Sequence, residues 1–209
     1  MKYKLVIFDF DGTLADSFAV LLEIWEIAAK RHGFKSFSRS DLERLRGRSA
    51  REIIAEAGLP WWKLPFVTRH MRVLMRERID KVRLFDGVET ILKTLKSEGL
   101  KIAIVTSNSR ENVERVLGAE GIAFIDHLGC GASIFGKKPK TRSAIKAFSV
   151  SSKEVLCVGD EIRDAEVAKE LGLDFAAVSW GYTNPEYLER LPEVRMCKNF
   201  LDVLSMAIV

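Results

Sequence analysis

Short, continuously apolar segments recur along this chain, and they constrain its fold more than any other feature. A segment of about four such residues suits a strand that is buried on both faces, as in a parallel sheet. The segments are residues 5–8, 102–105, 155–158 and 175–178. Helical periodicity separates the last three, so the alternation predicts an α/β fold with a doubly wound, mostly parallel, Rossmann-like sheet.

Two amphipathic stripes between these strands end at a glycine, which often closes a helix. The stripes are Val88, Ile91, Leu92 and Leu95 before Gly99, and Ala165, Ala168 and Leu171 before Gly172. Asn184 followed by Pro185 is typical of a helix start, because asparagine caps the first turn and proline fits its first position.

Residues 16–82 interrupt the alternation, since helical patterns follow one another there with no second strand. One apolar stripe consists of Phe18, Leu21, Leu22, Trp25 and Ala29. Ser40-x-x-Glu43 and Ser49-x-x-Glu52 resemble capping boxes, and the second leads into a helix that stops at Gly58. We therefore predict a core of residues 1–15 and 83–209 with an inserted helical cap of residues 16–82.

Composition excludes several classes of protein. The 209 residues are 47% hydrophobic and 30% charged, which excludes a disordered chain. No run approaches the roughly 18 to 20 apolar residues that a membrane span needs, and no signal peptide is evident, so we expect a cytoplasmic protein without a membrane partner. The three cysteines are widely spaced and form no pattern typical of a zinc site.

The charge is unevenly distributed. A net charge of +4 is too mild to indicate nucleic acid, and we expect no such partner. Between Arg39 and Arg83, however, twelve basic residues stand against six acidic ones. This basic stretch lies in the predicted cap, where it would favour anionic substrates.

The strongest chemical signal is Asp9-x-Asp11-Gly12-Thr13, which directly follows the first strand, where ligands of open α/β sheets normally bind. A strand ending in an Asp-Gly turn explains Gly12 but not two adjacent carboxylates. Unit charges about 4 Å apart repel by about 4 kcal/mol at an effective dielectric constant near 20, so the pair indicates a cation. Oxygen ligands alone favour Mg²⁺.

A second acidic cluster follows a later strand, in Gly159-Asp160-Glu161-Ile162-Arg163-Asp164. Asp160 is a candidate metal ligand, and Asp164, one helical turn later, is a candidate for orienting water or the neighbouring loop. The alternative is a helix whose first turn is simply acidic.

Polar residues also follow the strand at 102–105. Thr106, Ser107 and Asn108 offer hydrogen bonds to a phosphoryl oxygen, although Ser109 or its neighbours would equally serve as a helix N-cap. Gly136-Lys137-Lys138-Pro139 offers a cation on a loop.

In this order, Asp9-x-Asp11-Gly12-Thr13, Thr106, Lys138-Pro139 and Gly159-Asp160-x-x-x-Asp164 resemble the four motifs of the haloacid dehalogenase superfamily. The insertion after the first motif resembles the helical C1 cap of phosphatases similar to phosphoglycolate phosphatase. The resemblance implies a phosphatase that acts on a small phosphorylated metabolite with Mg²⁺ as cofactor.

The resemblance also implies roles. Asp9 would be the nucleophile that forms an aspartyl-phosphate, and Asp11 the general acid and then the base. Lys138, chosen because it immediately precedes Pro139, and Thr106 would complete the catalytic set. The implied metal residues are Asp9, Asp11, Asp160 and Asp164, with Asp11 acting through its main-chain carbonyl. The predicted substrate-binding residues are Gly12, Thr106, Ser107, Asn108, Lys138 and Arg48, the last because Gly47-Arg48 opens a cap helix from a flexible turn.

Some alternatives stay open on the sequence alone. A phosphomutase similar to β-phosphoglucomutase keeps every one of these motifs, and a non-catalytic binding protein with vestigial motifs is a further alternative. The identity of the phosphomonoester is not readable. We expect a monomer or a homodimer, the latter if Trp61 and Trp62 mark a contact between subunits.

Overall fold

The computed structural model describes residues 2–38, 41, 44–46, 48, 50–131 and 136–208. The predicted capping residues Ser40, Glu43 and Ser49, and Gly47 of the predicted turn, lie outside the described residues. Among the residues described, no helix combines the length and the apolar character that crossing a membrane requires.

A six-stranded, wholly parallel sheet forms the centre of the molecule, in the order β5-β4-β1-β6-β7-β8. Its strands are β1 (Leu5–Phe8), β4 (Lys101–Val105), β5 (His127–Gly129), β6 (Val155–Gly159), β7 (Asp174–Val178) and β8 (Val194–Cys197). The predicted α/β class with a doubly wound parallel sheet is confirmed.

Two strands were not predicted, β5 and β8, which lie at the two edges of the sheet. Both are short and mostly only partly buried. An edge strand with one exposed side needs no continuous apolar segment, so the pattern that reveals the central strands is missing from them.

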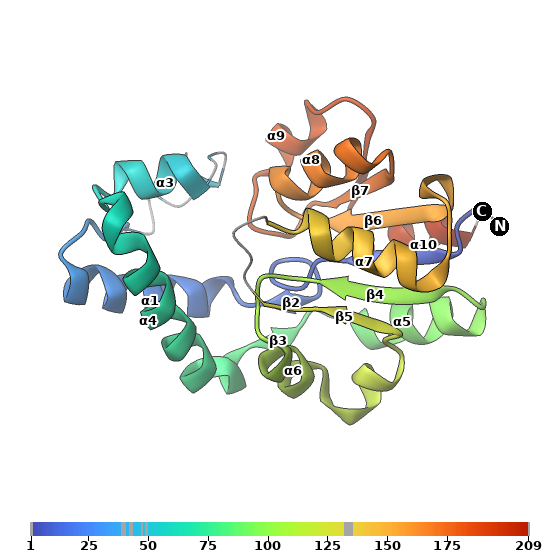
Figure 1. Cartoon of the computed structure of the whole chain (residues 1–209), viewed down its shortest axis with the longest axis horizontal. Coiled ribbons are helices and arrows are strands. Elements are labelled where there is room, and N and C mark those ends of the chain that lie inside the picture. The colour runs from blue at the N-terminus through green and yellow to red at the C-terminus, as the bar shows by residue number, and fades with distance from the viewer. Residues whose placement is uncertain are drawn as a thin grey trace.

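Helices cover both faces of the sheet (Figure 1). They are α5 (Val88–Ser97), α6 (Arg110–Ala123), α7 (Lys138–Phe148), α8 (Ile162–Leu171), α9 (Pro185–Glu189) and α10 (Phe200–Ile208). Successive strand side chains point to opposite faces. Val6 and Phe8 therefore join the core cluster under α5, α6 and α10, while Leu5 and Ile7 join the cluster under α7, α8 and α9.

The predicted helix ends agree with the structure. The stripe from Val88 to Leu95 is buried, and Gly172 closes α8 in the left-handed conformation. Asn184 caps α9, its side chain accepting a hydrogen bond from the Glu186 N–H, and Pro185 begins that helix.

The helices of residues 16–82 lie beyond one end of the sheet, opposite the two chain termini (Figure 1). Among the described residues they include α1 (Phe18–His32), α3 (Ala50–Glu56) and α4 (Leu64–Arg78), with short 3-10 turns at Trp61–Lys63 and Ile79–Lys81. A small antiparallel pair, β2 (Ala15–Asp16) and β3 (Arg83–Leu84), joins the segment's two ends.

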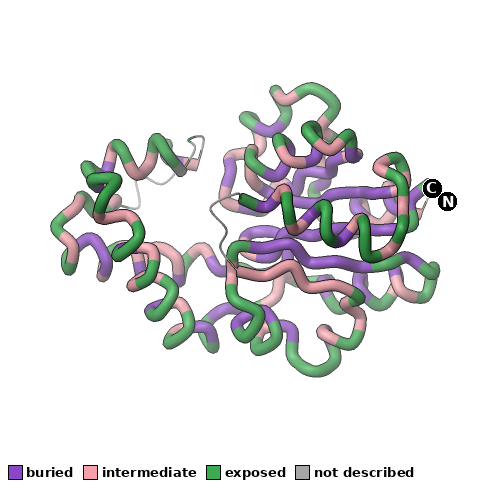
Figure 2. The backbone as a smooth tube through the Cα atoms, in the orientation of Figure 1, coloured by how far each residue is buried: buried purple, intermediate pink, exposed green. Residues whose placement is uncertain are grey.

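Packing differs between the two parts of the chain. The four central strands of the sheet are almost wholly buried, whereas much of the helical segment is intermediate or exposed (Figure 2). Val20, Ile24, Leu74 and Ile79 extend the main core into the base of the segment, and Ala28, Leu59 and Val67 form a small cluster further out. The assignment of residues 16–82 to a separate cap domain stays a prediction.

Candidate active site

Three neighbouring strands end in polar side chains at the same edge of the sheet. Asp9 follows β1, Thr106 follows β4 and Asp160 follows β6, and β1 lies between the other two strands. The Asp9 N–H donates to the Val158 carbonyl at 2.9 Å, which continues the ladder between β1 and β6. All three side chains are buried. Parallel pairing therefore gathers residues that are far apart in sequence.

An acidic cluster lies at this edge. Asp9, Asp160 and Asp164 each place a carboxylate oxygen within 4.8 Å of the others. Burial raises the pKa of Asp9 to about 7, with the charges of Asp164 and Glu161 adding to the rise and Lys137 opposing it. Burial also raises the pKa of Asp160 well above its usual value, with the charge of Asp9 contributing. Buried carboxylates this close together are stabilised in their ionised form only by a nearby cation.

Lys137 supplies one fixed positive charge within the cluster. Its Nζ lies 2.8 Å from Asp9 Oδ2 and 2.5 Å from Asp164 Oδ1, and all three side chains are buried. Burial alone lowers the pKa of the ammonium group, but the charges of Asp164 and Asp9 outweigh it and raise the pKa above its usual value. Lys137 is therefore charged in the folded protein.

The prediction that Lys138 is the lysine of the site is wrong. Its Nζ lies 2.7 Å from Glu170 Oε2 in a largely solvated ion pair, with the side chains 35% and 55% exposed. The preceding turn, with Gly136 at a φ of +69°, leads into α7, whose first residue is Lys138. Lys137 therefore precedes the helix beside the strand ends, while Lys138 already faces α8. Proximity to Pro139 in sequence does not reveal this difference in direction.

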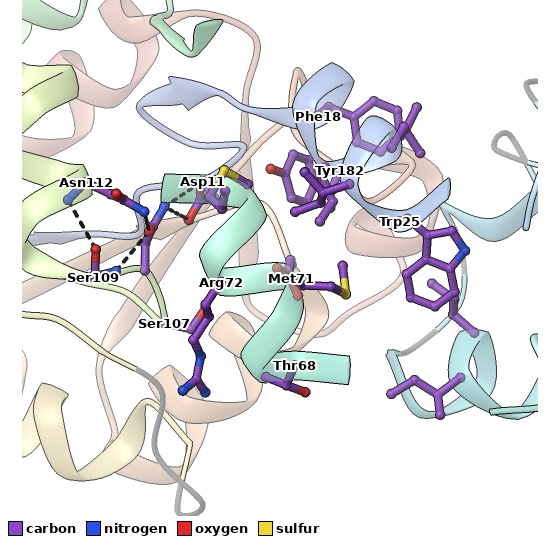
Figure 3. Close-up of a pocket in the computed structure, with 18 of the residues that line it drawn as sticks. Asp11, Phe18, Trp25, Thr68, Met71, Arg72, Ser107, Ser109, Asn112 and Tyr182 are labelled. Atoms are coloured by element: carbon purple, nitrogen blue, oxygen red, sulfur yellow. Dashed lines mark hydrogen bonds between the residues drawn. The ribbon is translucent and has the colours of Figure 1, made fainter. Parts of the chain in front are cut away.

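Asp11 lies beside the cluster, at the edge of a large cavity (Figure 3). Its carboxylate accepts hydrogen bonds from Ser17 Oγ at 2.7 Å and from Asn108 Nδ2 at 3.1 and 3.2 Å. Burial raises the pKa of Asp11, against the lowering effect of the hydrogen bonds from Ser17 and Asn108. The hydrogen bonds thus orient the Asp11 carboxyl group, and burial brings its pKa closer to the range in which it can exchange protons.

Asp164 has two contacts. Besides Lys137, its carboxylate accepts the Glu161 N–H at 3.3 Å in a capping box at the start of α8. The acidic helix start that the sequence left as an alternative is therefore present, and it lies within the acidic cluster.

Three glycines let the backbone approach these carboxylates. A Cβ at Gly12, whose φ is +79°, would lie 2.3 Å from Asp160 Oδ2, and one at Gly181 would lie 2.0 Å from Asp160 Cβ. A Cβ at Gly159 would lie 2.7 Å from Asp164 Oδ2. Thr13 Oγ1 donates to Asp160 Oδ1 at 2.8 Å. Gly12, a predicted substrate-binding residue, is thus placed directly against Asp160.

The polar residues that follow β4 lie near Asp11. The buried Thr106 accepts the Asn108 N–H at 3.0 Å through Oγ1, and Ser107 and Asn108 line the cavity. Ser109 caps α6 by accepting the Asn112 N–H, so the capping alternative applies to that residue. Lys140, which the sequence did not single out, donates from Nζ to the Thr106 carbonyl at 2.8 Å.

Tyr182 is the main site residue that the sequence did not indicate. Its N–H donates to Asp160 Oδ2 at 2.7 Å, and its hydroxyl lies 2.5 Å from Ser17 Oγ. Since Ser17 donates its own hydrogen to Asp11, Tyr182 is the donor to Ser17. Burial raises the pKa of Tyr182 well above its usual value and so keeps it neutral. The one available signal was position, because Gly181-Tyr182 follows the carboxyl end of β7.

The helical segment contributes arginines to this loop and to the cavity. Arg46 donates from Nε to the Tyr182 carbonyl at 3.0 Å and from Nη2 to the Gly181 carbonyl at 2.7 Å. Arg48, a predicted substrate-binding residue, lines the cavity, and its Nη1 lies 3.2 Å from Glu56 Oε2 in a partly exposed ion pair. Its role toward a substrate stays a prediction.

The fold and these side chains define an α/β enzyme with a buried acidic site at the carboxyl ends of its strands. A family model described as haloacid dehalogenase-like hydrolase matches residues 6–178. The chain belongs to this family. The predicted enzyme class, a phosphoric monoester hydrolase of this superfamily, is confirmed.

Individual relatives agree. The chain is 32% identical over 184 residues to a phosphoglycolate phosphatase from Synechococcus elongatus, covering 88% of this chain and 87% of the relative. It is 27% identical over 198 residues to an N-acetylmuramic acid 6-phosphate phosphatase from Pseudomonas aeruginosa, covering 89% and 86%. A solved haloacid dehalogenase-like hydrolase from Streptococcus pneumoniae superposes with a TM-score of 0.81 at 21% identity, covering 98% of both chains, which shows the shared fold.

Proposed function

We propose that the enzyme hydrolyses a small phosphate monoester through an aspartyl-phosphate on Asp9, with Mg²⁺ as cofactor. One observation carries the proposal: Asp9 shares a buried site with Lys137, Asp160 and Asp164, next to Asp11, which lines a large cavity. The names of the relatives support a phosphorylated metabolite as substrate.

The residues present fit a magnesium ion. Three buried carboxylates within 4.8 Å of one another supply only oxygen ligands, which Mg²⁺ prefers. At that separation two carboxylates repel by roughly 3 to 4 kcal/mol at an effective dielectric constant near 20, and Lys137 offsets only part of this repulsion. We assign Asp9 and Asp160 as side-chain ligands and the Asp11 carbonyl as a further ligand, with Asp164 completing the acidic set.

When bound, Mg²⁺ supplies positive charge that offsets the repulsion between the Asp9 carboxylate and a phosphate dianion. Lys137 adds a fixed cation 2.8 Å from Asp9 and holds that carboxylate in place. Thr106, Ser107 and Asn108 supply hydrogen bonds around the phosphoryl oxygens.

The chemistry takes two steps. A carboxylate oxygen of Asp9 forms a bond to phosphorus while the bond from phosphorus to the alcohol oxygen breaks, and Asp11 gives its proton to the departing alcohol. Asp11, now ionised, then takes a proton from a water whose oxygen attacks phosphorus, and the bond to Asp9 breaks. The products are the alcohol and inorganic phosphate. The hydrogen bonds from Ser17 and Asn108 keep Asp11 aimed through both steps.

Phosphate release from p-nitrophenyl phosphate tests the proposal. We expect release with Mg²⁺ and none with EDTA. Asp9→Asn should lower kcat by about 10⁴-fold or more, as loss of a nucleophile does in other enzymes that form covalent intermediates. Asp16→Asn, an exposed aspartate on β2, is the matched control and should keep full activity. Full turnover by Asp9→Asn would contradict the nucleophile assignment.

A further inference from the structure

Helix α1 carries two apolar faces, of which one is buried and the other is only partly buried. Val20, Ile24 and Ala28, four residues apart in turn, are buried. Val20 and Ile24 join the main core, while Ala28 packs with Leu59 and Val67. This face accounts for the attachment of α1 to the rest of the fold.

The second face of α1 lines a cavity. It consists of Phe18, Leu21, Leu22 and Trp25, which follow the helical spacing of three and four residues. Helix α4 contributes Thr68 and Met71 to the lining (Figure 3). Met75, at the same helical spacing, also lines the cavity. Neighbouring side chains cover part of the second face of α1, since Phe18 packs against Tyr182 and Trp25 against Phe34 and Phe37. The part that remains faces the cavity, where an apolar ligand would cover it.

The cavity continues into the candidate active site. Asp11, Ser107, Asn108 and Tyr182 line the same space as the apolar side chains, and Figure 3 shows Asp11, Tyr182 and Phe18 close together at one end. Its volume is about 740 Å³. Cavities of this size hold drug-sized ligands. A two-carbon alcohol would fill only a small part of this volume.

The arginines around the cavity do not by themselves require a second anion. Arg46 is bound to the Gly181 and Tyr182 carbonyls, Arg48 is paired with Glu56, and Arg163 is paired with Glu161. Arg72 and Arg76 are exposed, so water and salt screen their charge. Apart from Thr68, Arg72 and Arg76, the residues of α1 and α4 that line the cavity are apolar.

We propose that this apolar cleft, formed by the second face of α1 and the facing side of α4, binds the leaving group of the substrate. The preferred substrate is then a phosphate monoester of a bulky, largely apolar alcohol, with its phosphate at Asp9, its bridging oxygen at Asp11 and its body between the two helices. The inference rests on the proposed function, because the position of the leaving group follows from phosphate transfer to Asp9.

A series of alkyl phosphates tests it, from ethyl through butyl and hexyl to octyl phosphate. The leaving alcohols have nearly equal acidity, so a trend in kcat/KM reports binding rather than chemistry. We expect kcat/KM to rise about fourfold per added methylene until the cleft is filled. A fourfold rise corresponds to about 0.8 kcal/mol, the free energy gained by burying one methylene group. This measurement needs only the unaltered protein.

Two variants locate the effect. Leu22→Ser places a hydroxyl on the cleft wall and should flatten the rise with chain length. Leu201→Ser is the matched control, because Leu201 is 70% exposed on α10, outside the cleft, and both the trend and the turnover should stay as in the parent protein. Thermal unfolding of each variant verifies folding.

The outcomes separate the two proposals. No phosphate release from ethyl phosphate or p-nitrophenyl phosphate would overturn the proposed function. Release from both, with kcat/KM flat or falling along the series, would overturn only the apolar-leaving-group inference. A rise that Leu22→Ser leaves unchanged would place the binding outside this cleft and would overturn the inference as well.

Discussion

The core and the helical segment build the two sides of the active-site region in different ways. On the core side, Asp9, Thr106, Asp160 and Lys137 are buried, and neighbouring strands and hydrogen bonds hold each of them in place. On the helical side, partly exposed apolar side chains and arginines line the cavity. Groups that transfer a phosphoryl group need fixed geometry, whereas a surface that selects a leaving group needs only shape and apolar area. The contrast assigns chemistry to the core and selectivity to the helices.

The largest expected effect compares two adjacent lysines. Lys137→Met should lower kcat/KM by about 10² to 10³-fold, because it removes a preorganised charge from the reacting carboxylate. Lys138→Met should stay within about twofold of the parent, since it breaks only a solvated ion pair. Steady-state kinetics on p-nitrophenyl phosphate measures both, and urea unfolding verifies that Lys137→Met folds. Equal losses of kcat/KM in the two variants would contradict the assignment of Lys137, rather than Lys138, to the active site.

The second prediction concerns how the free energy of unfolding depends on pH through the buried Asp9. Asp9 has a folded-state pKa of about 7 against an ordinary 3.8, so between these values the folded protein binds more protons than the unfolded chain. Stability must therefore fall as pH rises through this window, by roughly 2 to 4 kcal/mol without metal. Urea unfolding in EDTA at pH 4.5 to 7.5 measures it.

Asp9→Asn is the control for that measurement, and it should remove the part of the fall that Asp9 contributes, because burial also raises the pKa of Asp160 and Asp11 and these groups keep their own contributions. Mg²⁺ should also reduce the fall, because a bound cation favours the ionised carboxylates. A free energy of unfolding that rises over the same range in EDTA would contradict the burial of these charges.

A smaller effect on activity is expected at Tyr182, which contacts Asp160 of the core and Phe18 of the helical segment. Tyr182→Phe removes the donor to Ser17 while keeping the ring beside Phe18 and the N–H to Asp160. This hydrogen bond orients the proton donor, and its loss should raise the activation free energy by about 1 to 1.5 kcal/mol. For ethyl phosphate, kcat should therefore fall about fivefold to tenfold.

The loss should be smaller for p-nitrophenyl phosphate, whose leaving group needs no proton. Tyr187→Phe, a partly exposed tyrosine on α9, is the matched control. Equal losses on both substrates would indicate a structural role for the Tyr182 hydroxyl rather than an effect on Asp11.

The smallest effect is expected on the helical side. Arg48→Ala should raise KM by no more than about threefold and leave kcat unchanged, because the guanidinium is partly exposed and already paired with Glu56. A rise of tenfold or more across several substrates would show that Arg48 binds an anionic part of the substrate. The selectivity of the helical side would then be electrostatic rather than apolar.

Much of the core could be predicted from the sequence because its signals are local. A buried parallel strand must be apolar throughout, so the central strands are visible in the chain, and a carboxylate directly after such a strand must lie at the carboxyl edge of the sheet. The sequence therefore predicts that Asp9 and Asp160 lie at that edge, and the structure has them there.

Other features depend on how distant segments meet. Lys137 and Lys138 are chemically identical neighbours, and only the turn before α7 decides which one reaches Asp9. Tyr182 reaches Ser17 and Asp11 because the loop after β7 folds over the strand ends, which no local pattern records. The apolar stripe of α1 was recognised, but its division between a packed face and a cleft face required the position of α4.

The central strands, the acidic strand ends and the family follow from the sequence alone, because backbone periodicity and residue chemistry are properties of short segments. Only the tertiary structure decided which cation joins the carboxylates, which hydroxyl orients Asp11 and which apolar face stays open to a ligand. Those choices depend on side-chain direction, and direction is set by packing between segments that are remote in the chain.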